Sequence, residues 1–539
     1  MTAKAPAKKP YVAFTWRAVF VGIVLSIVVC MYSAYAGLKV GGVYWPIITA
    51  TIMSFALLKI FGGGKTNKNE VNVAATAAST GGLLAAGIIF TVPAIWLLGL
   101  NISIAEVTFI AIVGGLLGVL FTIPLREEML ERLKLPYPDG TATAKVLEAG
   151  DEGGKKAKTV FAFFGLGGVF AIARDFFQTF PSYWNLDTLK LASAKYFSLG
   201  SSISLVPFSG GFLIGLKFTA IWFAGAVVSY LAVVPALVSY GFFADKVAAI
   251  MTVTKPFGIG VIIGASIVYF LIKGLPAFVP LLRGAWKKEK RSRWWFIAII
   301  VFAALLSFAL RLNVVIAIVS IFGAFLVSYI AARITGEINI DPMEVFAMAI
   351  LIIVLLFVQL DPIVAVVLAA ILCISAGMAG DFMQDLKAGS LVGTKPRDQI
   401  KAQLISVFSS GIVIGIVLLA LDSMYKIGSL DLPAPQAVAL AAIVSAGGIS
   451  QYMIWGIVLG GVLTLLSVYF KQGIAPIAFG IGLYAPIELS FALFAGGVIR
   501  YFADKKGFTE KGRLIAAGLI GGEGFLGVLL ALLGMFALI

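Results

Sequence analysis

Long apolar runs, broken only by short polar segments, cover most of the chain. The runs at 294–309, 314–332 and 345–360 contain almost no polar residue, and a membrane-spanning helix needs about 20 such residues. The strands of a transmembrane barrel would alternate polar and apolar side chains instead. The pattern therefore predicts helical spans near 17–37, 43–61, 73–99, 104–124, 157–180, 203–217, 218–240, 256–281, 294–310, 313–333, 343–360, 362–379, 402–421, 452–470, 475–486, 487–503 and 511–536.

Composition supports this pattern. Hydrophobic residues make up 60% of the 539 residues and charged residues 12%, whereas a soluble domain has about 45–50% apolar and about 25% charged residues. The segments 203–217 and 475–486 are short enough to be half-spans. We therefore predict an all-α polytopic membrane protein with about 16–17 transmembrane helices, for which the lipid bilayer is the first partner.

The net charge of +15 is concentrated in the connecting segments. This is typical of cytoplasmic loops under the positive-inside rule, so nucleic acid is not an expected partner. The chain has no histidine, and its two cysteines, Cys30 and Cys373, lie inside apolar runs. We therefore expect no metal site, disulfide or cofactor, and any proton chemistry would use carboxylates, tyrosine or lysine.

Two parts of the chain repeat each other in order. Leu-Pro-Tyr-Pro at 135–138 matches Leu-Pro-Ala-Pro at 432–435, and the pattern of 223–232 recurs at 494–503. Chance similarity between apolar helices is the alternative. Because internal duplication is frequent in secondary transporters, we predict a first eight-helix repeat at 17–282 and a second repeat at 313–539.

Charge predicts how the two repeats are oriented. A cytoplasmic N-terminal tail at 1–16 places the basic segments 126–158 and 283–293 in the cytoplasm too. The region 283–312 is then a basic loop and a linker helix that inverts the second repeat, which also brings 387–401 and 500–513 inside. Parallel repeats with one span fewer would leave 500–513 outside. We expect inverted repeats, in a multi-pass protein of the plasma membrane.

The stretches after the two proline motifs, 140–150 and 437–447, are too short to span a bilayer. Amphipathic surface helices are one interpretation. Re-entrant or broken helices are the other, and irregular backbone at membrane depth is tolerated only where protein buries it or where it lines a cavity. Matching broken segments in two halves are typical of a transport site.

The same motifs resemble a known family. Arg126 and Glu127 followed by LPYPDGTATA at 135–144 resemble the signature of the oligopeptide transporter superfamily, which includes the yellow-stripe-like branch. TGEINIDPM at 335–343, GDFMQDLK at 380–387 and FGIGLY at 479–484 are similar to further family segments, with Asp341 replacing an asparagine. The resemblance implies a prokaryotic-type symporter for oligopeptides or metal–amino-acid chelates, typically driven by protons. A homodimer is possible in such a protein.

Polar residues within the spans are candidates for binding the substrate or ion, because a charge at the centre of a helix costs about 2.5–3.5 kcal/mol. Glu523 lies among glycines, and Glu488 begins a short span. Glu337 lies between two spans and is not explained as a helix cap, whereas Asp341 and Glu344 are expected to cap the next helix. Further candidates are Asp381, Gln384 and Asp385 on one helical face, Arg174 and Asp175, and Tyr137, Asp139 and Thr141 of the first proline motif.

Several candidates have structural alternatives. Asp381 and Asp385 could form an interfacial network with Arg397. Arg174 and Asp175 are adjacent and do not face each other on an α-helix, so we expect separate partners. Lys39, at the end of the first span, is expected to reach the membrane surface.

We therefore predict an ion-coupled secondary transporter for peptides or small chelates, with a passive channel or facilitator as the alternative. A channel would favour rings of repeated filter residues, which the sequence lacks. An intramembrane enzyme is not expected, because no nucleophile–base set or His-Glu motif is present.

Overall fold

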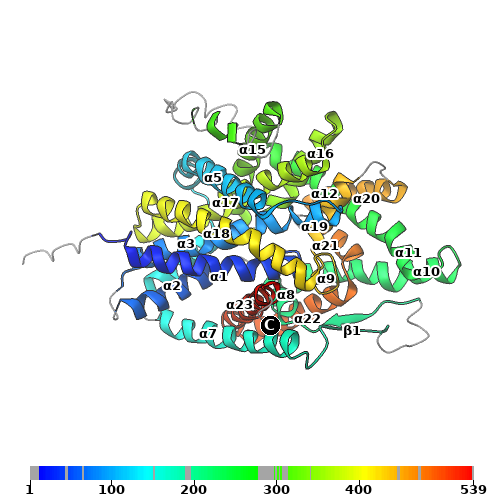
Figure 1. Cartoon of the computed structure of the whole chain (residues 1–539), viewed down its shortest axis with the longest axis horizontal. Helices are drawn as coiled ribbons and strands as arrows, with labels where there is room; N and C mark the ends of the chain where they lie inside the picture. The colour runs from blue at the N-terminus through cyan, green and yellow to red at the C-terminus, as the bar shows by residue number, and fades with distance from the viewer. Residues whose placement is uncertain are drawn as a thin grey trace, which may run out of the picture.

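The computed structural model describes residues 11–42, 47–62, 66–149, 152–187, 196–276, 313–339, 341–445, 450–470 and 475–536, with isolated positions between 297 and 305. Helices form almost all of its regular structure (Figure 1). The first part contains α1 (Trp16–Val40), α2 (Ile47–Phe61), α3 (Lys68–Ile89), α4 (Pro93–Leu97), α5 (Ile104–Arg126), η1 (Glu127–Arg132), α6 (Pro138–Ala149), α7 (Glu152–Ala171), η2 (Ile172–Phe176), β1 (Tyr183–Asn185), β2 (Gly200–Ser202), α8 (Leu205–Ile214), α9 (Leu216–Ala226), η4 (Val227–Val233), α10 (Val234–Ser239), α11 (Lys246–Ala249), η5 (Ile250–Thr254), α12 (Lys255–Tyr269) and η6 (Phe270–Gly274).

The second part is helical throughout its described residues. It contains α15 (Val314–Ile338), α16 (Met343–Phe357), α17 (Pro362–Val392), α18 (Pro396–Tyr425), α19 (Pro435–Val444), α20 (Gln451–Tyr469), α21 (Ala475–Tyr484), α22 (Ile487–Lys505) and α23 (Thr509–Met535). In Figure 1, α1, α7 and α18 run along the long axis of the molecule, and β1 lies at the end opposite the start of α1.

The helix lengths confirm an all-α polytopic membrane protein. Eleven helices within the described ranges are long and apolar enough to cross a bilayer, and five apolar helices are shorter. The count of 16–17 crossings therefore stays a prediction. The expected half-spans are present as α8 and α21, whose 10 residues each extend about 15 Å. The basic loop and most of the linker helix at 283–312 lie outside the described residues, as does the start of the tail at 1–16.

One local feature departs from the prediction. Strands β1 and β2 pair antiparallel, with Tyr183 opposite Ser202, in a region where no strand was expected. Two three-residue strands carry too short an alternation to be recognised in a sequence.

Glycines allow the long helices to approach each other closely. A Cβ on Gly81 of α3 would clash with the backbone of Ser26 in α1, and one on Gly522 of α23 would clash with the backbone of Phe164 in α7. Small residues at helix contacts are how membrane helices gain packing without a hydrophobic driving force. The glycines around Glu523 are therefore first of all packing residues.

Contacts between distant segments bring the basic termini of several helices to one face, here called the basic face. Tyr11 donates to Asp398 (2.9 Å) and accepts from the Lys395 N–H (2.8 Å). Lys156 at the start of α7 pairs with Glu510 at the start of α23 (2.7 Å). The end of α2 links the two groups, because Phe61 packs edge-on against Phe20 of α1 and Lys59 lines a surface hollow together with Lys158 of α7. The N-terminal segment and these parts of 126–158, 387–401 and 500–513 thus share a face. The side of the membrane they face stays a prediction.

In the predicted repeats, α3, α5, α7 and α12 correspond in order to α17, α18, α20 and α23, and with this correspondence the two parts exchange packing partners. Helix α7 packs on α23, and α20 packs on α12; likewise α3 packs on α18 and α5 on α17. Two duplicated halves would pack in this reciprocal way. The duplication and its inversion themselves remain predictions.

Candidate functional site

The second proline motif covers the end of α1. Its Ala434 has a positive φ of 46°, and its N–H donates to the Leu38 carbonyl (2.7 Å). The Gln436 amide donates to the Gly41 carbonyl. The last carbonyls of a helix have no partner within the helix, so a segment almost 400 residues further along the chain supplies two of the missing donors. We call this contact the α1–α19 junction.

The first proline motif covers the end of α15 in the same way. Tyr137 also has a positive φ of 43°, and its N–H donates to the Gly336 carbonyl (3.1 Å). The Asn339 side chain accepts from the Asp139 N–H (3.2 Å) and from the Gln384 amide (2.7 Å). Gln384 in turn accepts from the Gly140 N–H (2.8 Å). We call this contact the α15–α6 junction.

The short helices that follow the junctions differ in burial. Helix α19 is buried on almost every side, which excludes a surface helix there. Helix α6 buries one face, including Gly140 and Thr143. Gln384 lies eight residues before the end of α17 at Val392, about 12 Å along the helix. The α15–α6 junction therefore lies inside the protein and not at the basic face itself.

Next to the α1–α19 junction, Arg174 lies at the π-helical turn η2. Its guanidinium donates to both carboxylate oxygens of Asp175 (2.6 and 2.8 Å), to Glu523 (2.7 Å), to Tyr35 (2.9 Å) and to the Ile203 carbonyl (3.2 Å). The expectation that Arg174 and Asp175 do not pair is wrong. A π-helical turn changes the angular spacing of successive side chains, and a long guanidinium can then reach its neighbour.

Glu523 is 0% exposed and accepts four hydrogen bonds. One oxygen accepts from Arg174 (2.7 Å) and the Ser204 hydroxyl (2.5 Å). The other accepts from the N–H groups of Leu205 (2.6 Å) and Val206 (3.2 Å). These N–H groups begin α8, so Glu523 lies at the positive end of a half-length helix.

Two tyrosines and a lysine complete this group. Lys39 is 3% exposed, so it does not reach the membrane surface as expected, because the α1–α19 junction covers the end of α1. Its ammonium donates to the Tyr35 hydroxyl (3.0 Å), and the Tyr425 hydroxyl donates to Asp175 (3.0 Å). The arginine cluster, as we call it, consists of Tyr35, Lys39, Arg174, Asp175, Tyr425 and Glu523.

Near the α15–α6 junction, three acids form a second group, the aspartate cluster of Asp341, Asp381 and Asp385. Asp385 accepts from the Ser79 hydroxyl (2.7 Å) through one oxygen. Its other oxygen, one oxygen of Asp381 and both oxygens of Asp341 are buried without a donor. The Asp341 carboxylate packs against Gly380, the residue before Asp381, so closely that a Cβ on Gly380 would clash with it.

Neither structural alternative for these acids holds. Within the described residues, no ion pair involves the aspartate cluster; Arg397 lies near Asp398 instead (4.0 Å) and is exposed. Asp341 is not the N-cap residue of α16, which is Pro342. The Met343 N–H lies near the Asp341 carboxylate, but neither carboxylate oxygen forms a hydrogen bond. Gln384 is joined to the junction rather than to the carboxylates.

Glu337 and Glu488 lie apart from both clusters, whereas Tyr137, Asp139 and Thr141 belong to the α15–α6 junction beside the aspartate cluster. Glu337 is exposed and pairs with Arg333 (3.0 Å) one turn earlier. Glu488 accepts from Asn185 of β1 (3.2 Å). The hydroxyls of Tyr137 and Thr141 donate to backbone carbonyls (2.7 Å each), so both side chains maintain the junction.

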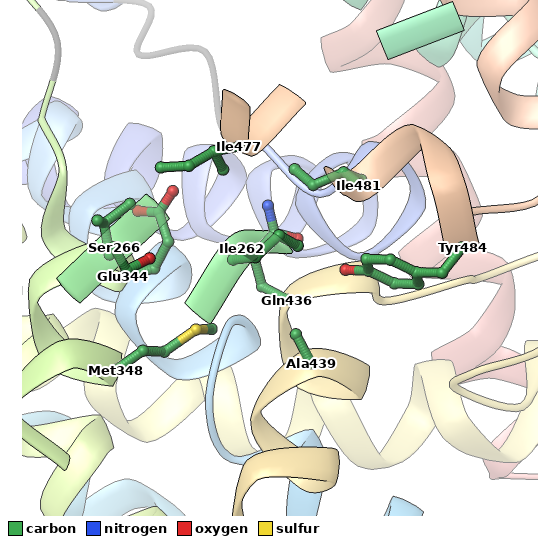
Figure 2. A pocket seen from close by; sticks show the side chains of 10 residues that line it. Ile262, Ser266, Glu344, Met348, Gln436, Ala439, Ile477, Ile481 and Tyr484 are labelled. Carbon is green, nitrogen blue, oxygen red and sulfur yellow. The ribbon is translucent and has the colours of Figure 1, made fainter. Parts of the chain in front are cut away.

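A small cavity lies between α12, α16, α19 and α21 (Figure 2). Figure 2 shows Ser266 beside Glu344 at one end, Gln436 in the middle and Tyr484 at the other end. Its volume of about 20 Å³ suits about one water molecule. The Ser266 hydroxyl and the Gln436 carbonyl oxygen have no donor or acceptor there, so the cavity is polar enough for water and too small for a peptide.

The described residues contain no group of three His, Cys, Asp or Glu side chains arranged to hold a metal ion. Sequence reasoning did not identify Tyr35, Ser204 and Tyr425 as part of a site. The spacing of Tyr35 one turn before Lys39 was the one available signal, since such residues share a helical face.

Comparison with known proteins points to one family. The model of the family described as OPT oligopeptide transporter protein matches residues 13–282 and 283–534. Two relatives are each named as a putative oligopeptide transporter. The one from Haemophilus influenzae is 28% identical over 92% of this chain and 92% of its own length. The one from Saccharomyces cerevisiae is 31% identical over 29% of this chain and 24% of its own length.

Proposed function

Because this chain belongs to the oligopeptide transporter family, we propose that it is a secondary active transporter that imports oligopeptides, or metal–amino-acid chelates, together with protons. The family match over residues 13–282 and 283–534 confirms the resemblance to the oligopeptide transporter family. The names of both relatives support a peptide as substrate. In this proposal the protein lies in the plasma membrane with the basic face in the cytoplasm and has no enzymatic activity. The homodimer remains a prediction.

The observation that carries the coupling proposal is the aspartate cluster. Four carboxylate oxygens of its three acids are buried without a donor, and an uncompensated buried charge is costly. Binding of a proton removes the charge and supplies a donor. Intramembrane acids of this kind are typical of proton relays. In the proposal, Asp381 and Asp385 exchange the coupling proton.

The two junctions serve as gates in this proposal. The α15–α6 junction lies near the basic face, whereas the α1–α19 junction lies at the opposite end of α1. With both junctions formed, the cavity beside α19 holds about one water, which suits a closed state. Opening one junction at a time would give alternating access, as rocking of repeats does in other transporters.

A passive facilitator is the alternative, and uptake by the purified protein in proteoliposomes distinguishes the two. We expect a labelled peptide or chelate to accumulate above its external concentration when the outside is acidic, and a protonophore to abolish this. Equal uptake with and without a gradient would support a facilitator. Uptake that depends on neither a proton nor a sodium gradient would contradict ion coupling.

A further inference from the structure

We propose that Arg174, Ser204 and the N-terminus of α8 form a binding site for the C-terminal carboxylate of a peptide, and that Glu523 occupies this site when no substrate is bound. This inference rests on the proposed peptide transport. It identifies the C-terminal carboxylate as the substrate group that the protein recognises. Glu523 is then a carboxylate of the protein itself that takes the place of this group.

The donors around Glu523 are arranged for a carboxylate. Arg174 binds one oxygen (2.7 Å) beside the Ser204 hydroxyl, and two successive N–H groups at the start of α8 bind the other. Charge-assisted hydrogen bonds of this kind are the strong ones in proteins. Helix N-termini bind anions because their N–H groups and dipole point at the ligand, and half-helix N-termini in transporters face anionic substrate groups.

The carboxylate now in the site comes from another part of the fold. Glu523 belongs to α23, whereas Ser204 and α8 follow the β1–β2 hairpin and Arg174 follows α7. Because α23 stays packed on α7 through Gly522, only the Glu523 side chain needs to turn away while the donors keep their mutual arrangement. Asp175 maintains this arrangement, because it holds Arg174 through two hydrogen bonds that do not involve Glu523.

Lys39 supplies the second part of the argument. It is a buried ammonium, 3% exposed, that donates to Tyr35 and forms no ion pair within the described residues. The arginine cluster thus holds two cations and a positive helix end of about half a charge against two carboxylates. Asp431 also acts on Lys39 by its charge, but within the described residues no carboxylate contacts the Lys39 ammonium directly. Lys39 can therefore form an ion pair with Glu523 when the peptide carboxylate displaces it.

The exchange follows from these positions. The peptide carboxylate binds Arg174 and the start of α8, and Glu523 turns toward the Lys39 ammonium, which Tyr35 already links to Arg174. No bond is broken other than hydrogen bonds and ion pairs. Lys39 is therefore a positioning residue that accepts the displaced Glu523, and the site selects substrates with a free C-terminus.

The first test asks whether the site binds a carboxylate, independently of transport. Glu523→Ala leaves the donors without their acceptor. We expect sodium acetate to raise the unfolding temperature of the purified variant saturably, because a ligand that binds the native state stabilises it. Acetamide should have no such effect, and neither probe should stabilise the wild type or the surface variant Glu510→Ala. An equal effect of acetate and acetamide, or none on Glu523→Ala, would overturn the inference.

The second test uses Glu523→Gln, which keeps the side-chain shape if the alanine variant does not fold. We expect this variant to bind a tripeptide with a free C-terminus about tenfold more tightly than the wild type, a gain of about 1.4 kcal/mol. Its affinity for the C-terminally amidated tripeptide should stay unchanged. Lys39→Met should weaken binding of the free tripeptide in the wild-type background only.

The outcomes distinguish a failure of the carboxylate site from a failure of the proposed peptide transport. If the wild type imports amidated and free peptides equally well, peptide transport stands and the carboxylate site is wrong. If the wild type imports no peptide but acetate stabilises Glu523→Ala, the site binds a carboxylate and the peptide assignment of the transporter is wrong.

Discussion

The α1–α19 and α15–α6 junctions have the same backbone arrangement, but the buried carboxylates beside them differ in whether they have hydrogen-bond donors. At both, the residue between two prolines has a positive φ and donates its N–H to the end of a distant helix. Beside the first junction, all four carboxylate oxygens of Asp175 and Glu523 have donors. Beside the second, four oxygens of the aspartate cluster have none.

This difference indicates a division of roles. A buried carboxylate with strong donors is stabilised as an anion and holds several helices together. A buried carboxylate without donors stabilises nothing as an anion and is free to bind a proton or a cation. We therefore expect the arginine cluster to determine stability and substrate binding, and the aspartate cluster to determine coupling.

The largest expected effect on stability comes from Arg174→Met. This change removes the cation from two buried carboxylates, and breaking a buried ion pair costs about 3–5 kcal/mol. Unfolding of the purified protein in detergent, followed by denaturant titration, measures the loss. Lys156→Met breaks the exposed pair with Glu510 and should cost about 0–1 kcal/mol. Similar losses for the two variants would show that the arginine cluster stabilises the fold no more than a surface ion pair does.

A smaller loss is expected at the other junction from Gly140→Ala. A Cβ there would clash with the backbone carbonyl of Gln384, and crowding of a packed contact costs about 1–3 kcal/mol. Gly165→Ala is the matched control, because nothing lies within 4 Å of a Cβ on that α7 residue. It should instead stabilise by about 0.5–1 kcal/mol. The same unfolding assay reads both signs, and a stabilising Gly140→Ala would show that the junction is loose.

Tyr137→Phe is a milder change at the same junction. It removes the hydrogen bond from the Tyr137 hydroxyl to the Ala332 carbonyl (2.7 Å) and keeps the buried ring, so the expected loss is about 0.5–1.5 kcal/mol. Tyr240→Phe, in a residue that is 80% exposed, should leave the unfolding free energy unchanged. If both variants unfold like the wild type, the tyrosine hydroxyl does not stabilise the junction.

The sequence predicted the elements better than their contacts. Hydrophobic runs placed α8 and α21 as half-length helices, because length and apolarity are local properties. The burial of Lys39 depends instead on Ala434, almost 400 residues away, and no local pattern contains that contact. The pairing of Arg174 with Asp175 depends on a π-helical turn, which the usual helical spacing does not anticipate.

Helix-capping rules led to the wrong role for two of the acids. Asp341 precedes a proline and looks like a helix cap, yet α16 starts after Pro342, so its carboxylate lies without a donor. Glu337 is not explained as a helix cap and so looks like a functional acid in the sequence, although Arg333 lies four residues earlier and pairs with it. The second case is visible in the sequence as an i, i+4 pair, whereas the first depends on how the chain folds around Pro342.

The smallest expected effect on stability, and the sharpest test of the comparison, comes from making the same isosteric change in both clusters. Asp381→Asn removes a buried charge that has no ion pair, so the unfolding free energy should change by less than about 1 kcal/mol. Asp175→Asn removes a paired charge beside Arg174 and should cost about 3 kcal/mol or more.

Transport should respond in the opposite order. Asp381→Asn cannot exchange a proton, so its uptake in proteoliposomes should no longer rise with an inward proton gradient, while downhill exchange of substrate continues. Asp187→Asn, at an exposed acid of the hairpin region, should retain the response to the gradient. A stable Asp381→Asn variant that still accumulates substrate would move the coupling site to another acid, with Asp385 as the next residue to test because one of its oxygens is also without a donor.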